Sequence, residues 1–310
     1  MNNWIVPLAE FFSSQLGTTA KIEALSRIVG GHSRGMYRLE IQTDTVKSYV
    51  LRIEQGGVFG TQGASEFRLM QALSQAGAPV APVCFEETTG ELLGEPFFVM
   101  EFVEGEETLP DTGVLKNFVR TLQRFHQLDW KTHALPFAPA RDTAEAVDQQ
   151  ITRWQGVYQE ASSHAIPLLD EAAAWLHYNH PALNELQLVH GDAGPGNFIH
   201  ADGNIRALTD FEFCHLGDPA EDWVFCAIMR GLRVMTTEQW RGFLSETADI
   251  NLSDEQWHYW RAFNLFKGAC ANITALDVFQ SGRNPAPNMY IVGTALHQSF
   301  LRQLTTLIAP

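Results

Sequence analysis

The sequence predicts an α+β protein in two parts, a small β-rich part up to about residue 103 and a larger, mainly helical part after it. The first part contains short apolar segments that are separated by turn residues, which is typical of strands. An acidic stretch rich in helix- and strand-breaking residues follows at 104–112 and suits a connection between two parts. Beyond it, apolar residues recur at helical spacing. At 310 residues and 45% hydrophobic residues, the chain has length for one large or two ordinary domains and is not disordered.

The first part is predicted to be a small sheet with one helix. Turn residues at 42–45 separate two of its strands, and Gly77 marks the end of the helix, which spans about 64–76 with Ser65 as a candidate N-cap. The expected strands are 36–41, 48–53, 80–85 and 97–103.

The second part is predicted to be helical with one β-hairpin region. Leu115, Phe118, Val119, Leu122 and Phe125 follow the spacing of one helix face. Further helices are expected near 143–160, 166–178, 219–233, 237–248, 254–276 and 288–308. Between them, the apolar segments 186–190, 198–200 and 205–210, with a turn at 201–204, indicate the hairpin region.

Charge and cysteine usage exclude several classes of protein. The 21 basic and 36 acidic residues give a net charge of -15, which argues against nucleic-acid binding because a phosphate backbone needs a basic face. The four cysteines form no CxxC pair and no disulfide framework, so we expect reduced thiols. No signal peptide and no run of about 18 apolar residues is evident, so a cytoplasmic protein without a membrane partner is expected.

The densest polar cluster is His190-Gly-Asp-Ala-Gly-Pro-Gly-Asn197, and Asp210-Phe-Glu212 follows thirteen residues later. On a Gly/Pro-rich loop, Asp192 and Asn197 can converge on one point, and Asp210 at the end of the hairpin can face the same point. Hard oxygen ligands of this kind suit Mg²⁺, which retains waters and borrows phosphate oxygens. Asp192 would then accept a proton. In-line phosphoryl transfer requires this combination of a base and metal-bound oxygens.

These residues, together with Leu216-Gly-Asp-Pro-Ala-Glu-Asp222, resemble the signature of the aminoglycoside phosphotransferase family. That family belongs to the protein-kinase-like superfamily and has choline, homoserine and hydroxyacyl kinases as relatives. The likeness spans nearly the whole chain. It implies a bilobal protein-kinase-like fold, with a nucleotide-binding N-lobe at 1–103 and a catalytic and substrate-binding C-lobe at 104–310.

The resemblance also implies roles for individual residues. Asp192 is the implied catalytic base, and Asn197 and Asp210 are the implied Mg²⁺ ligands. The implied nucleotide-binding residues are those of the phosphate-covering loop, of the strand and helix that grip the phosphates, and of the backbone that holds the adenine: Gly30, Gly31, Ser33, Arg52, Glu66, Met100, Glu101 and Val103.

Two positions depart from the wider pattern. Arg52 stands where the superfamily mostly has lysine, although the hydroxyacyl-CoA-associated branch also has Val-Leu-Arg. Arginine can clamp a phosphate and Glu66 together, but in a geometry that differs from that of lysine. Asp210 is followed by Phe-Glu rather than Phe-Gly, as is common in small-molecule kinases of this family.

Several of these residues have a plain structural alternative. Asp192 suits an Asx-turn, and Glu66 suits the first turn of a helix, where the dipole favours an acid. For Asp222 we favour a structural role, hydrogen-bonding the backbone of the catalytic loop. His190 is expected to support the same loop, and His126 is expected to be a satisfied interior histidine.

The sequence therefore predicts a small-molecule kinase that transfers the γ-phosphoryl group of ATP or GTP to a hydroxyl with the help of Mg²⁺. The acceptor is either an aminoglycoside-like amino sugar or a metabolic hydroxyl such as a hydroxyacyl thioester. Two alternatives remain open, a catalytically silent nucleotide-binding module and a metal-dependent phosphohydrolase. The sequence gives no indication of oligomeric state.

Overall fold

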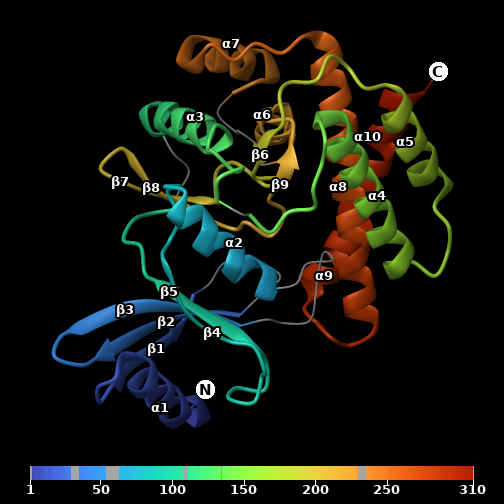
Figure 1. Cartoon of the computed structure of the whole chain (residues 1–310). Helices are drawn as coiled ribbons and strands as arrows, with labels where there is room; N and C mark the ends of the chain where they lie inside the picture. The colour runs from blue at the N-terminus through green and yellow to red at the C-terminus, as the bar shows by residue number, and fades with distance from the viewer. Residues whose placement is uncertain are drawn as a thin grey trace.

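The computed structural model describes residues 2–28, 35–53, 63–107, 111–133, 135–229 and 235–309 of the chain. It confirms the predicted fold class, with an antiparallel sheet in the N-terminal part and mostly helices in the C-terminal part (Figure 1).

A five-stranded antiparallel sheet with the order β1-β2-β3-β5-β4 forms the N-terminal part. Its strands are β1 (Lys21–Arg27), β2 (Gly35–Gln42), β3 (Val46–Ile53), β4 (Val83–Glu87) and β5 (Phe97–Glu101). The short 3₁₀ helix η1 (Asn2–Trp4) and α1 (Ile5–Leu16) precede the sheet, and α2 (Gly63–Gln75) follows β3.

The two faces of this sheet serve different cores, because successive side chains of a strand point to opposite faces. Tyr49 and Leu51 of β3 pack in a cluster with Leu8 and Phe12 of α1. Their neighbour Val50 belongs instead to the large core that α2 and the C-terminal helices share. Arg52, two residues after Val50, therefore lies on the face of the sheet that looks toward α2 and the C-terminal part.

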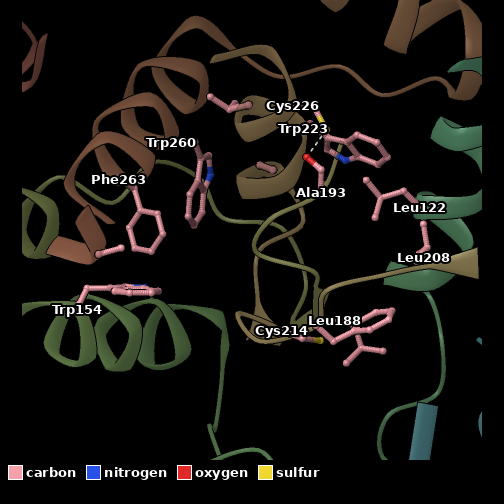
Figure 2. Close-up of a cluster of buried hydrophobic side chains, with 14 of the residues drawn as sticks. Leu122, Trp154, Leu188, Ala193, Leu208, Cys214, Trp223, Cys226, Trp260 and Phe263 are labelled. Carbon is pink, nitrogen blue, oxygen red and sulfur yellow. Dashed lines mark hydrogen bonds between the residues drawn. The ribbon is translucent and has the colours of Figure 1, made fainter. Parts of the chain in front are cut away.

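Helix α8 (Asp254–Gln280) is the centre of the C-terminal part, and most of its 27 residues are buried. Around it lie α3 (Thr112–His126), α4 (Thr143–Ala161), α5 (Pro167–Tyr178), α6 (Ala220–Ile228), α7 (Thr237–Ala248), α9 (Pro287–Ile291), the π-helical turn η3 (Val292–Leu296) and α10 (His297–Ile308). Figure 2 shows Trp154 of α4 close to Phe263 and Trp260 of α8 in this core.

Two small antiparallel ladders hold the loops that carry the polar cluster. The first pairs β6 (Gln187–Val189) with β9 (His215–Gly217), and the second pairs β7 (Phe198–Ala201) with β8 (Asn204–Leu208). The predicted hairpin is thus β7–β8 alone. The segment 186–190 does not join it, because its partner is a strand that follows the hairpin in sequence.

Other boundaries also differ from the sequence prediction. The strand expected at 80–85 begins only at Val83, and Ser65 lies inside α2 rather than at its N-cap. The single helix expected at 288–308 is interrupted by η3. Helix α1 and strand β1 were not predicted.

Backbone hydrogen bonds tie the β7–β8 hairpin to the segment after β5 and to the segment after α2. The amide of Glu106 donates to the carbonyl of His200 at 2.8 Å, and the amide of His200 donates back at 3.0 Å. The amide of Leu208 donates to the carbonyl of Pro79 at 2.7 Å. Gly105 permits this approach, since a Cβ there would lie 2.6 Å from the His200 carbonyl oxygen. Among the described residues, no helix is both long and apolar enough to cross a membrane.

Candidate active site

Asp222 fixes the loop between β6 and β7 that carries Asp192. Its carboxylate accepts hydrogen bonds from the amides of His190 at 2.7 Å and Gly191 at 2.8 Å, and from Nε2 of His126 at 2.9 Å. Burial alone would raise the pKa of Asp222, but the hydrogen bond and charge of His126 and the contacts with His190 lower it to about 2. The predicted structural role of Asp222 and the interior position of His126 are confirmed.

Gly191 brings this loop against the segment that follows β8. Its φ of +80° is a left-handed conformation that favours glycine, and a Cβ would lie 2.4 Å from the carbonyl oxygen of Phe213. A side chain at position 191 would therefore push apart the two segments that carry Asp192 and Asp210.

A second buried group supports the loop from α8. The Nζ atom of Lys267 donates to the carbonyl oxygen of Gly191 at 2.7 Å and lies 2.5 Å from Oε1 of Glu221. His215 lies 3.2 Å from the other carboxylate oxygen of Glu221. Burial would raise the pKa of Glu221, but the charges of Lys267 and His215 lower it. Sequence reasoning missed Lys267, because a single lysine within a long apolar helix carries no motif.

The side chains of Asp192 and Asn197 meet across the loop. Nδ2 of Asn197 donates to Oδ2 of Asp192 at 2.7 Å and to the Asp192 carbonyl at 2.8 Å. Asn197 is buried and Asp192 is half-buried. Ala193, the residue after Asp192, is held by Cys226 of α6. The Sγ atom of Cys226 lies 3.2 Å from the carbonyl oxygen of Ala193 (Figure 2).

His190 also supports the loop, as predicted. Its Nδ1 accepts a hydrogen bond from the amide of Asp192 at 3.3 Å, and its Nε2 lies 3.0 Å from the Thr209 carbonyl oxygen. Both contacts suit the tautomer that carries the proton on Nε2. The imidazole therefore couples the residue before Asp210 to the loop of Asp192.

Asp210 joins the loop region to the sheet. Arg52 lies 3.2 Å from Oδ1 of Asp210 and 2.9 Å from Oε2 of Glu66. Arg52 and Glu66 are both buried. Burial would lower the pKa of Arg52, but the charges of Glu66, Asp210 and Glu212 raise it, so the guanidinium is a permanent cation. Asp210 has a φ of +65°, a strained conformation for a residue other than glycine that is frequent at functional sites.

The donor atoms present fit a Mg²⁺ ion. Because Asn197 donates to Asp192 through Nδ2, its Oδ1 is the atom that would be available to a metal. The side chain of Asp210 is 34% exposed. Burial, and after it the charge of Asp210, raises the pKa of Glu107, so Glu107 lies within electrostatic reach of Asp210. Among the described residues no group of three His, Cys, Asp or Glu side chains could hold a metal. Such a group is not required for Mg²⁺, because this ion needs only one or two protein oxygens besides waters and substrate phosphates.

The remaining predicted nucleotide-binding residues fall in two segments of the chain. Gly30, Gly31 and Ser33 lie outside the described residues. The others fall at the end of β5, where Met100 is buried and Glu101 is exposed, and Val103 follows the strand. The amides of Glu101 and Phe102 already donate to the carbonyls of Pro82 and Ser48. A nucleotide at this edge would use other backbone groups.

Comparison with protein families and curated proteins gives two results. A model of the phosphotransferase enzyme family matches residues 24–263. Mouse acyl-CoA dehydrogenase family member 10 is 26% identical over 84% of the chain and 27% of its own length. Rat acyl-CoA dehydrogenase family member 11 is 28% identical over 81% of the chain and 36% of its own length. The chain thus spans about a third of the length of these curated relatives.

Solved structures share the fold over almost the whole chain. A candidate aminoglycoside phosphotransferase from Ralstonia eutropha has a TM-score of 0.70 at 18% identity, covering 98% of this chain and 97% of its own. The choline kinase LicA from Streptococcus pneumoniae has a TM-score of 0.68 at 15% identity, covering 96% and 98%. The aminoglycoside phosphotransferase APH(4)-Ia, in a ternary complex with ADP and hygromycin B, has a TM-score of 0.64 at 14% identity, covering 98% and 99%.

Proposed function

Because the chain belongs to the phosphotransferase enzyme family and is a small-molecule kinase, we propose that it transfers the γ-phosphoryl group of ATP or GTP to a hydroxyl, with Mg²⁺. The observation that carries the proposal is a chain of contacts. Asn197 binds the Asp192 carboxylate, and the amide of Thr209, the residue before Asp210, donates to the Asn197 carbonyl at 3.0 Å. Arg52 in turn links Asp210 to Glu66. A silent nucleotide-binding module would not need this full set.

Asp192 is the proposed base. Its half-buried carboxylate is oriented by Asn197, while buried hydrogen bonds to Asp222 hold the preceding two amides. The acceptor oxygen forms a bond to the γ-phosphorus as the bond to the leaving nucleoside diphosphate breaks. The hydroxyl proton passes to Asp192.

Nucleotide phosphates are proposed to lie beside Arg52 and Asp210. Arg52 keeps its charge at any physiological pH and presents a planar donor set to phosphate oxygens. Mg²⁺, held by Asn197 and Asp210, would neutralise charge on the phosphates. The ADP that APH(4)-Ia binds in its ternary complex supports a nucleotide in this fold.

The acceptor is proposed to be a metabolic hydroxyl compound such as a hydroxyacyl thioester. The support is the similarity to relatives that are named acyl-CoA dehydrogenases, which extends over 84% of the chain in the mouse protein. An amino sugar such as hygromycin B is the alternative, supported by a likeness at 14% identity.

Thermal melting with nucleotide tests the metal and nucleotide roles. ATP or GTP with Mg²⁺ should stabilise the protein, since a ligand bound only by the folded state adds about 2.7 kcal/mol at a hundred times its dissociation constant. Asp210→Asn should remove most of the Mg²⁺-dependent part of the shift. Asp202→Asn is the matched control, because Asp202 also has a positive φ but is exposed on the β7–β8 turn.

Release of nucleoside diphosphate with a panel of hydroxyl compounds tests the reaction itself. A kinase consumes ATP in proportion to the phosphorylated acceptor formed, whereas a phosphohydrolase releases phosphate without acceptor. A melting temperature that does not respond to any nucleotide, with or without Mg²⁺, would refute the proposed function.

A further inference from the structure

Helix α4 carries a guanidinium that has no ion-pair partner within the described part of the chain. Arg153 is half-buried, and its guanidinium carbon lies 5.0 Å from the centroid of the Trp154 ring. Burial lowers the pKa of Arg153, and the more distant charges of Glu212 and Glu221 only partly oppose that effect. A desolvated cation of this kind is costly to the folded protein unless an anion approaches it.

Arg153 lines a surface groove of about 630 Å³ on α4. The groove also has three carboxylates, but each already has a partner. Asp142 caps α4 by accepting from the amide of Glu145, and Glu145 pairs with Arg141. Asp148 contacts the two histidines at the end of α5, His177 at 2.6 Å and His180 at 3.3 Å.

Packing holds this part of α4 against the segment after β8, which contains Asp210. The ring of Trp154 lies 5.1 Å from that of Phe213, edge to face. Phe213 directly follows Glu212, and Glu212 acts electrostatically on both Arg52 and Arg153. Glu212 thus lies within electrostatic reach of both Arg52 on the sheet and Arg153 on α4.

The two cations are placed for different ligands. Arg52 is engaged with Glu66 and Asp210, beside the proposed nucleotide phosphates. Arg153 belongs to the helical part, from which an acceptor would have to approach Asp192 if the nucleotide lies against the sheet. An unpaired guanidinium there attracts an anion and repels an ammonium group.

We propose that Arg153 binds an anionic group, a carboxylate or a phosphate, on the phosphate acceptor, and so selects anionic hydroxyl compounds over cationic amino sugars. This assignment rests on the proposed kinase function. It concerns which acceptor is used, and the kinase function itself would stand without it.

Steady-state kinetics with matched acceptors test the proposal. The probes are medium-chain hydroxy acids with the hydroxyl at successive positions, each as the free carboxylate, the neutral methyl amide and the coenzyme A thioester, together with hygromycin B. The wild-type protein should phosphorylate an anionic form and not the amide or hygromycin B. Turnover of the free acid identifies a carboxylate as the bound group, and turnover of the thioester alone identifies a coenzyme A phosphate.

Arg153→Gln should raise the KM for the preferred anionic acceptor by about tenfold or more and leave the KM for ATP within about twofold. Arg153→Lys should lie between the two, because it keeps the charge and loses the planar donor pair. Arg141→Gln is the matched control, since Arg141 lines the same groove but is already paired with Glu145.

A purely structural Arg153 gives a different result. In that case Arg153→Gln would lower the melting temperature and impair all acceptors equally, which would overturn the proposal, as would wild-type preference for the amide or for hygromycin B. We expect the melting temperature of Arg153→Gln to be unchanged or higher. If the wild-type protein shows neither nucleotide-dependent stabilisation nor transfer to any acceptor, the kinase function fails rather than the role of Arg153.

Discussion

Lys267 donates a hydrogen bond to the carbonyl oxygen of Gly191 at 2.7 Å, from the middle of a buried helix to the loop that carries Asp192. The same ammonium group pairs with Glu221 in the first turn of α6. The neighbouring Asp222 binds the amide of Gly191. Helix α6 thus holds the amide of Gly191, and helix α8 holds its carbonyl.

Replacing Lys267 by methionine should destabilise the protein by about 3–5 kcal/mol, because it leaves the buried Glu221 without its cation. Urea unfolding measures this loss. Lys116→Met on the exposed face of α3 is the control and should lie within about 0.5 kcal/mol of wild type. The double variant Lys267→Met with Glu221→Gln should recover part of the loss. A single variant as stable as wild type would contradict the role assigned to Lys267.

The sequence was sufficient to predict the residues whose chemistry is concentrated in one motif. Asp222 could be assigned to loop support because it follows a recognisable block. Lys267 could not, since it lies 76 residues from its partner Gly191 and its neighbours in α8 are mostly apolar. Contacts of this kind depend on how helices pack, which a local pattern does not encode.

Strand β1 and the β6–β9 pairing were missed for related reasons. In β1 only Ile22 is buried, so the strand lacks the apolar alternation on which a sequence prediction depends. The partner of β6 lies beyond the β7–β8 hairpin, and three-residue strands carry too little pattern to define their pairing. The large helices were predicted well, because their apolar residues recur at helical spacing over long segments.

Asp222 should make the stability of the protein fall at acid pH. Its pKa is lowered from 3.8 to about 2 in the folded state, so its contribution is complete above the unfolded pKa and is lost as the pH falls toward 2. The size of this contribution is roughly 2 kcal/mol. Urea unfolding at pH 5, 4 and 3 should show a shallower decline for Asp222→Asn than for wild type. Parallel declines would contradict the assignment.

Glu66→Gln should impair nucleotide use. The substitution keeps the shape of the side chain but removes the charge that faces the buried Arg52 at 2.9 Å. We expect a higher KM for ATP and a lower kcat, because the guanidinium is no longer held between two carboxylates.

Glu145→Gln is the control for a helix-dipole effect. Glu145 also lies in the first turn of its helix but is far more accessible than Glu66. A dipole effect alone would change the stability of both variants by about 0.3–1 kcal/mol and leave their kinetics unchanged. Equal kinetics for Glu66→Gln and wild type would therefore favour the structural alternative for Glu66.

Asp192→Asn should separate catalysis from binding. A proton acceptor in phosphoryl transfer contributes typically ~10²–10⁴-fold in rate, whereas nucleotide binding does not need its charge. The variant should keep the MgATP-dependent rise in melting temperature and lose most turnover. Asp222→Ala should behave differently, because it leaves the buried amides of His190 and Gly191 without an acceptor. The expected loss of stability is about 1–3 kcal/mol or more. A stable but inactive Asp222→Ala together with an unfolded Asp192→Asn would reverse the assignment of base and scaffold.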